Sequence, residues 1–223
     1  MVTINQSISN DNLMERWLRL NIYLSEEEKS IIKKIIKQVG NDLSIFYNMN
    51  KHIVLGKGEI YNKELQLSFA CSEKNVSLKS SYGDIQMDAE EFRKIIAAII
   101  DIYEVVYPVG TVVDLDKNYF KHRFNVDEMD DIRVVISHRY VPYGENMYIP
   151  YMGIHYPFGP LPVANNGVSF TPRAIKKVVH MGYSDEEEEA FLYKVKEAFI
   201  IEGNKQSTSF LVDNKYINEL LKK

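Results

Sequence analysis

The chain has 223 residues, which suits one large domain or two small ones. Hydrophobic residues make up 45% of the chain, enough for a packed core. The formal net charge of −4 argues against nucleic acid as a partner, and the single Cys71 excludes an intrachain disulfide and a cysteine zinc cluster.

The start of the chain, Met1–Asn12, is polar and lacks the basic and apolar regions of a signal peptide. No apolar stretch approaches the roughly 20 residues that span a bilayer. We therefore expect a soluble, cytoplasmic protein without membrane insertion.

The first segment with a clear pattern, Asn10–Leu24, fits two kinds of structure. A helix fits the spacing of Leu13, Trp17, Leu20 and Leu24, whereas a strand fits the alternation of Leu18, Leu20, Ile22 and Leu24. We favour the helix.

A second helix is predicted from Ser25, because Ser25 and Glu28 have the spacing of a capping box. The helix is expected to run to Val39, and Gly40 then terminates it.

The period changes to two between Lys51 and Met87, which predicts an antiparallel meander of three or four strands. Cys71 falls on the inward side of this pattern and is interpreted as a small core residue. Asp88 with Glu91 is a second capping box, and its helix should run to about Tyr107 and cover the meander.

Pro108 should end that helix and mark a domain boundary. Beyond it we expect a small, strongly bent or barrel-like sheet with strands at Thr111–Leu115, Ile132–Arg139, Tyr148–His155 and Val168–Phe170.

The last part of the chain combines helical and strand signals. Thr171-Pro172 predicts a helical turn ending near Val179, and Ser184 with Glu187 predicts a capped helix to about Ile200. The inner stripe of that helix should contain Phe191, Leu192, Val195 and Phe199. Phe210–Val212 is expected as a strand and Tyr216–Leu221 as an amphipathic turn.

These elements predict an α+β fold in three parts. An N-terminal α+β domain of residues 1–107 carries the meander and its long helix. A small β domain of residues 108–203 ends in a helix, and residues 204–223 form a strand and helix tail.

Little in the sequence indicates a catalytic, metal or cofactor site. The five histidines, His52, His122, His138, His155 and His180, lack zinc-site spacing. The acidic cluster Asp127–Asp131 lacks the glycine and terminal glutamate of a calcium loop. The chain contains no nucleophile elbow and no P-loop. We expect a protein that is not an enzyme and uses no cofactor.

The aromatic segment from Tyr140 to Phe158 has two interpretations. Its side chains pack a strand and turn, or they form a partner-binding surface, because tyrosine offers a large area with few rotatable bonds. The candidate binding residues are Tyr140, Tyr143, Tyr148, Tyr151, Tyr156 and Phe158. The candidate structural turn residues are Pro108, Gly110, Gly153, Pro157, Gly159 and Gly182.

Four motifs follow one another between Pro108 and Phe199: Tyr107-Pro-Val-Gly-Thr-Val-Val, Arg133-Val-Val-Ile, Tyr151-Met-Gly-Ile-His-Tyr-Pro-Phe-Gly and Gly182-Tyr-Ser-Asp-Glu. In this order the chain resembles a small domain family of unknown function, encoded beside LXG toxins in Gram-positive type VIIb secretion loci.

The resemblance implies a cytoplasmic accessory factor that binds an LXG-type toxin, together with small helical partner proteins, before export. An immunity protein that neutralises the toxin domain is the alternative. The resemblance does not extend to the first hundred residues.

Overall fold

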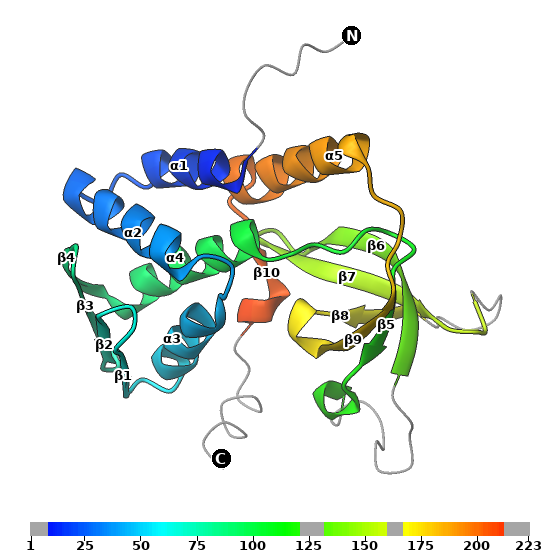
Figure 1. Cartoon of the computed structure of the whole chain (residues 1–223), viewed down its shortest axis with the longest axis horizontal. Coiled ribbons are helices and arrows are strands. Elements are labelled where there is room, and N and C mark those ends of the chain that lie inside the picture. The colour runs from blue at the N-terminus through cyan, green and yellow to red at the C-terminus, as the bar shows by residue number, and fades with distance from the viewer. Residues whose placement is uncertain (1–8, 121–131, 160–166, 212–223) are drawn as a thin grey trace, which may run out of the picture. The chain divides into compact units, whose positions relative to one another are not determined.

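Figure 1 shows a computed structural model of the chain, which describes residues 9–120, 132–159 and 167–211. The chain folds as two compact units, one of Met1–Glu104 with Leu211–Lys223 and one of Val105–Phe210. We call these the first unit and the second unit. Each combines helices with a mainly antiparallel sheet, so the predicted α+β class is confirmed.

The first unit has a four-stranded sheet in the order β1-β2-β3-β4, with every neighbouring pair antiparallel. The predicted meander is therefore confirmed. In chain order the elements are α1 (Asn10–Leu20), α2 (Glu26–Val39), α3 (Ser44–Val54), β1 (Gly58–Asn62), β2 (Leu67–Cys71), β3 (Asn75–Ser80), β4 (Gly83–Asp88) and α4 (Ala89–Tyr103).

Polar side chains define the helix starts of the first unit. Ser25 accepts a hydrogen bond from the backbone N–H of Glu28, whose carboxylate accepts from the backbone N–H of Ser25, so the predicted capping box is present. Asp88 caps α4 by accepting from the backbone N–H groups of Glu90 and Glu91. Gly40 follows α2 with a φ of 66°, a backbone conformation that favours glycine.

Two sequence expectations for the first unit were wrong. Residues 51–54 belong to α3, a helix that was not predicted because Leu43 stands at its cap position and makes no side-chain capping hydrogen bond. The helix α4 ends at Tyr103, before Tyr107, because Glu104 adopts an extended backbone. The Glu104 carboxylate accepts a hydrogen bond from the Tyr47 hydroxyl at 2.6 Å.

The core of the first unit lies on one face of its sheet. The buried strand residues alternate as expected: Leu67, Phe69, Val76, Leu78 and Ile85. The ring of Phe69 lies 5.9 Å from the ring of Phe92 in α4, measured between centroids. The helix α4 packs on β3 and β4, α2 packs on β4, and α3 packs on β1 and β2. Covering the meander therefore takes α2 and α3 as well as the long helix.

The second unit is built mainly of strands. Its elements are β5 (Val112–Leu115), η1 (Lys117–Phe120), β6 (Ile132–Tyr143), β7 (Met147–His155), β8 (Gly167–Phe170), η2 (Pro172–Ala174), β9 (Ile175–His180), α5 (Glu186–Lys196), η3 (Glu197–Glu202), β10 (Gln206–Ser207) and η4 (Thr208–Phe210). His122, Asp127–Asp131 and Tyr216–Leu221 lie outside the described residues.

The sheet of the second unit runs in the order β10-β7-β6-β5-β9, and β8 also pairs with β7. Two strands share one edge of β7. The strand β10 pairs in parallel with the first residues of β7, and β8 pairs antiparallel with the last residues of β7. Pairing among the described strands leaves this sheet open, so the barrel-like form that was expected is wrong.

The helical turn expected up to Val179 is also wrong. Only Pro172–Ala174 forms a short 3-10 turn, and the chain then enters β9, which pairs antiparallel with β5. Two register shifts interrupt this pairing, so Ile175 and Val178, three residues apart, both pack against the core. An apolar spacing of three arises here from a bulged strand, although it is typical of a helix.

The acidic helix begins one residue later than predicted. Asp185, rather than Ser184, is the cap, and its carboxylate accepts from the backbone N–H of Glu188. The helix continues into a π-helical turn at Glu197–Glu202. Phe191 is 58% exposed and is not part of an inner stripe. Phe210 lies in a 3-10 turn and not in a strand.

The core of the second unit lies on one face of the six-stranded sheet. Its buried members are Val113, Leu115, Phe120, Ile132, Val134, Ile136, Tyr151, Val168, Phe170 and Ala174. Phe120 and Ala174 come from the turns η1 and η2, and the others come from β5, β6, β7 and β8, so the strand positions predicted from hydrophobic alternation are confirmed.

Candidate functional site

The aromatic segment divides into buried and exposed residues. Tyr140, Tyr148 and Tyr151 are buried. The rings of Tyr140 and Tyr148 stack with centroids 4.9 Å apart, and each meets the ring of Phe199 at 5.7 Å. Edge and stacked contacts of this kind stabilise a core. In this fold these three tyrosines pack the interior and are not available to a partner.

Tyr151 has a further role in the second unit. Its ring stacks on Phe170 at 5.3 Å, and its hydroxyl accepts a hydrogen bond from the backbone N–H of Tyr107 at 2.9 Å. The segment that enters β5 is therefore held by the central strand β7.

Tyr151→Phe should destabilise the second unit by roughly 1–2 kcal/mol, because the N–H of Tyr107 loses its acceptor while the ring remains in place. The matched control is Tyr156→Phe, in which the lost hydroxyl belongs to a side chain that is 51% exposed, and its effect should stay within about 0.5 kcal/mol. Urea unfolding of both variants measures the difference. Equal midpoints would show that the hydroxyl contributes nothing.

The exposed aromatic residues lie at opposite ends of the β6–β7 hairpin. Tyr143, 52% exposed, precedes the turn, whereas Tyr156 and Phe158, 51% and 71% exposed, follow the far end of β7. The eight steps of β7 between these ends correspond to about 26 Å. The six candidate binding residues therefore do not form one surface, and only Tyr156 and Phe158 lie close together in the chain.

The candidate turn residues occupy several environments. Thr111 N–H donates to the Pro108 carbonyl across a turn in which Gly110 has a φ of 87°. The Tyr156–Pro157 bond is cis, and Gly159, at a φ of 66°, donates its N–H to the His155 carbonyl.

Gly153 and Gly182 are required for a different reason, which is close packing. Gly153 lies within β7, where a Cβ would meet a methyl group of Val134 and the Val135 carbonyl at 3.0 Å. At Gly182 a Cβ would lie only 2.5 Å from the carbonyl oxygen of Val109.

The second face of the six-stranded sheet, opposite the core, is partly open. We define it by Val112, Asp114, Arg133, Val135, Ile154 and Lys177, all half-buried or exposed. Pairing places Val112 beside Val135 and Val135 beside Ile154, which forms an apolar row across three strands. Pairing also places Asp114 beside Arg133 and Lys177, which forms a charged row. Tyr156 adjoins this second row, because its N–H donates to the Arg133 carbonyl at 3.0 Å.

The charged row contains a bidentate ion pair. Arg133 Nε and Nη2 donate to the two carboxylate oxygens of Asp114 at 2.7 and 3.0 Å. The hydrogen bond from Arg133 lowers the pKa of Asp114, and the charges of Arg133, Lys177 and Lys176 lower the pKa further against a smaller opposing effect of burial. This pair fixes β5 to β6 on the side of the sheet that faces away from the core.

The stability that Asp114 contributes should depend on pH. A lowered pKa in the folded state means that the contribution is present above the ordinary aspartate pKa of about 3.9 and is lost as the pH falls through the folded-state pKa. Asp114→Asn should therefore cost about 0.2–1 kcal/mol near pH 7. The gap from the unsubstituted protein should narrow as the pH falls from 7 to below the ordinary aspartate pKa of about 3.9. Urea unfolding at both ends of this pH range tests this, and a gap that widens toward low pH would contradict it.

Residues 106–191 match a family model described as Domain of unknown function (DUF4176). Residues 106–191, all within the second unit, are similar to this family. The match covers less than half of the chain and confirms a small domain of unknown function where the resemblance placed one. Its link to LXG toxins stays a prediction. No curated protein and no solved structure matches the chain.

Sequence reasoning missed Tyr183, the most exposed aromatic side chain among the described residues of the second unit. Tyr183 is 81% exposed, and Met181, two residues earlier, is 51% exposed. The signal was available, because Gly182 interrupts an apolar run directly before an acidic stretch. In the resemblance, the motif that begins at Gly182 was interpreted as a structural turn. Only the exposed fraction of its side chain shows that Tyr183 does not contribute to the core.

The described residues show no grouped metal ligands: residues 9–120, 132–159 and 167–211 contain no cluster of three His, Cys, Asp or Glu side chains able to hold an ion. Cys71 is half-buried, and burial raises the pKa of its thiol. None of the helices in those same ranges has both the length and the apolar composition of a bilayer span.

Proposed function

We propose that this protein is a non-enzymatic accessory factor that binds an LXG-type toxin in the cytoplasm and prepares it for export by a type VIIb secretion system. The family link in this proposal comes from the ordered motifs between Pro108 and Phe199, and the DUF4176 match at residues 106–191 supports the domain assignment. The small helical partners implied by the resemblance would join the same complex.

The observation that carries the proposal is the exposure of Tyr156 and Phe158. An exposed phenylalanine at 71% is costly in water unless a partner covers it, and aromatic side chains supply much of the affinity in protein interfaces. Both side chains follow β7 at the end where the Asp114–Arg133 pair lies. An apolar anchor with a charged rim is the usual anatomy of a protein-binding surface.

The binding test uses tagged full-length protein expressed with the LXG toxin gene encoded beside it. We expect the toxin's N-terminal targeting region to co-purify. The paired replacement Tyr156→Ala and Phe158→Ala should weaken the complex by at least about tenfold, since each side chain of an interface centre can contribute more than about 1 kcal/mol. Tyr143→Ala, at the other end of the hairpin, is the control and should bind normally.

A deletion strain separates the two candidate roles. An accessory factor predicts that the strain stops exporting the toxin and survives. An immunity protein predicts normal export and killing by the strain's own toxin, together with co-purification of the toxin domain in place of the targeting region. If no toxin fragment binds, the proposed function is wrong.

A further inference from the structure

The strand β9 is an edge of the six-stranded sheet. It is the last strand in the sheet order, and its only partner among the described strands is β5 (Figure 1). An edge of this kind presents unpaired backbone N–H and C=O groups to any chain that can adopt an extended conformation beside it.

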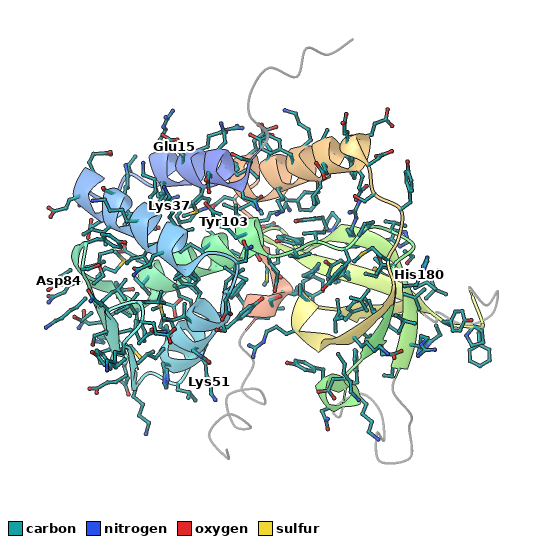
Figure 2. The ribbon with its side chains drawn as sticks, in the orientation of Figure 1. Glu15, Lys37, Lys51, Asp84, Tyr103 and His180 are labelled. Carbon is teal, nitrogen blue, oxygen red and sulfur yellow. The ribbon has the colours of Figure 1, made fainter. Side chains whose placement is uncertain are left out.

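The edge continues beyond the end of β9 at His180, which Figure 2 labels. Gly182 N–H donates to the Thr111 hydroxyl at 3.0 Å, which holds the following segment against the start of β5. Asp185 also has an extended backbone, with a φ of −145°. We define the edge segment as Ile175–Asp185, which comprises the strand β9 and the residues that lead from it to the cap of α5.

The middle of this edge is apolar and exposed. Val179, Met181 and Tyr183, at alternate positions, are 40%, 51% and 81% exposed. The core of the unit takes Ile175 and Val178 from the same segment, whereas these three side chains stay exposed, although Met181 Sδ accepts a hydrogen bond from the Thr111 hydroxyl at 3.9 Å. Exposed apolar residues on an open strand edge indicate a surface that pairs with another strand.

The two ends of the edge carry opposite charges. Lys176 and Lys177 lie at its start, and the acidic residues lie at its end: Asp185, Glu186, Glu187 and Glu189, all exposed. Glu188, within the same run, is instead bound to Arg139. The edge is therefore basic at one end, apolar in the middle and acidic at the other end.

We propose that this edge pairs with the same edge of a second copy of the chain, antiparallel about a two-fold axis at Met181. In that register Lys177 of one copy lies opposite Asp185 of the other and next to Glu186. Val179 lies opposite Tyr183, a pairing of a β-branched with an aromatic side chain that stabilises antiparallel strands. Each two-fold-related half repeats the same contacts, as an isologous dimer requires.

The charge pattern selects a second copy over other edge partners. Lysines on an edge strand usually repel neighbouring chains. Antiparallel self-pairing instead brings the basic end of each copy to the acidic end of the other, so both ends are compensated at once. A pairing through one strand edge buries less surface than a standard interface, so the dimer is weak and depends on concentration.

Sedimentation equilibrium of the full-length protein, over micromolar to millimolar concentrations, tests the pairing through charge reversal. Lys176→Glu and Glu186→Lys, at directly opposite positions in this register, should each weaken dimerisation by at least about tenfold, because each places like charges across the edge. The double variant should restore it to within about threefold. Lys63→Glu, an exposed lysine of the first unit, makes the same change in net charge and should leave the dimer intact.

Two further measurements complete the test. Tyr183→Ser, at a side chain outside the core, should abolish the dimer while the thermal midpoint stays unchanged. Raising the salt from about 0.1 M to 1 M should weaken the dimer, because the Debye length falls from about 10 to 3 Å. A protein that is monomeric at all concentrations overturns the proposal. A dimer whose affinity is unchanged by the charge reversals also overturns it, since such a dimer forms through another surface.

Discussion

Gly182→Ala should destabilise the second unit by roughly 1–3 kcal/mol or more, the range for inserting a group into a fully packed site. A Cβ at this position would lie 2.5 Å from the carbonyl oxygen of Val109 and 2.9 Å from the backbone nitrogen of Thr111. Both atoms belong to the backbone that leads into β5, so neither can move as a side chain would. The conflict must displace Gly182, and the hydrogen bond from its N–H to the Thr111 hydroxyl is then lost.

Urea unfolding of the full-length protein measures this effect. Ser184→Ala is the control, because Ser184 is exposed and only two residues away, and its effect should stay within about 0.5 kcal/mol. If Gly182→Ala unfolds at the same urea concentration as Ser184→Ala, the backbone contact between Gly182 and Val109 is not part of the native structure.

Ile99→Asp should destabilise the first unit by roughly 3–5 kcal/mol. Ile99 is 2% exposed within α4, a helix that packs on β3 and β4. The substitution removes an apolar side chain from the core, and it places an uncompensated carboxylate there. The two effects add, which puts this variant among the largest expected for a single substitution.

Lys94→Asp is the matched control, because it introduces the same carboxylate into the same helix at an exposed position. Its effect should stay within about 0.5 kcal/mol. Circular dichroism during thermal unfolding distinguishes the two variants. Equal thermal midpoints would mean that the buried face of α4 has been assigned incorrectly.

Strand positions in the second unit were predictable because each of these strands has one buried face. A strand with one buried face alternates apolar and polar residues, and β5, β6, β7 and β8 follow this rule closely. The strand β9 was not predictable, since two register shifts bring Ile175 and Val178 to the same side. A bulge depends on the neighbouring strand, and the local sequence of β9 does not contain that information.

The candidate binding residues show the same limit. Tyr148 and Tyr156 look equivalent in the sequence, but Tyr148 is buried against Phe199 and Tyr156 is exposed. Phe199 lies 51 residues further along the chain than Tyr148. The tyrosine that Phe199 covers depends on where the segment containing Phe199 packs. The residues around each tyrosine do not determine that position. Tyr183 was overlooked for the converse reason, because the motif around it predicted a turn and not a surface.

By itself the sequence determined the α+β class, an antiparallel meander of three or four strands, and the helix starts at Ser25 and Asp88. These depend on local hydrogen bonds and on the period of apolar residues, which a few neighbouring residues specify. The tertiary structure decided the open sheet, the edge position of β9 and the division of the aromatic residues into core and surface. Those features depend on contacts between residues far apart in the chain, and such contacts form only when the whole unit has packed.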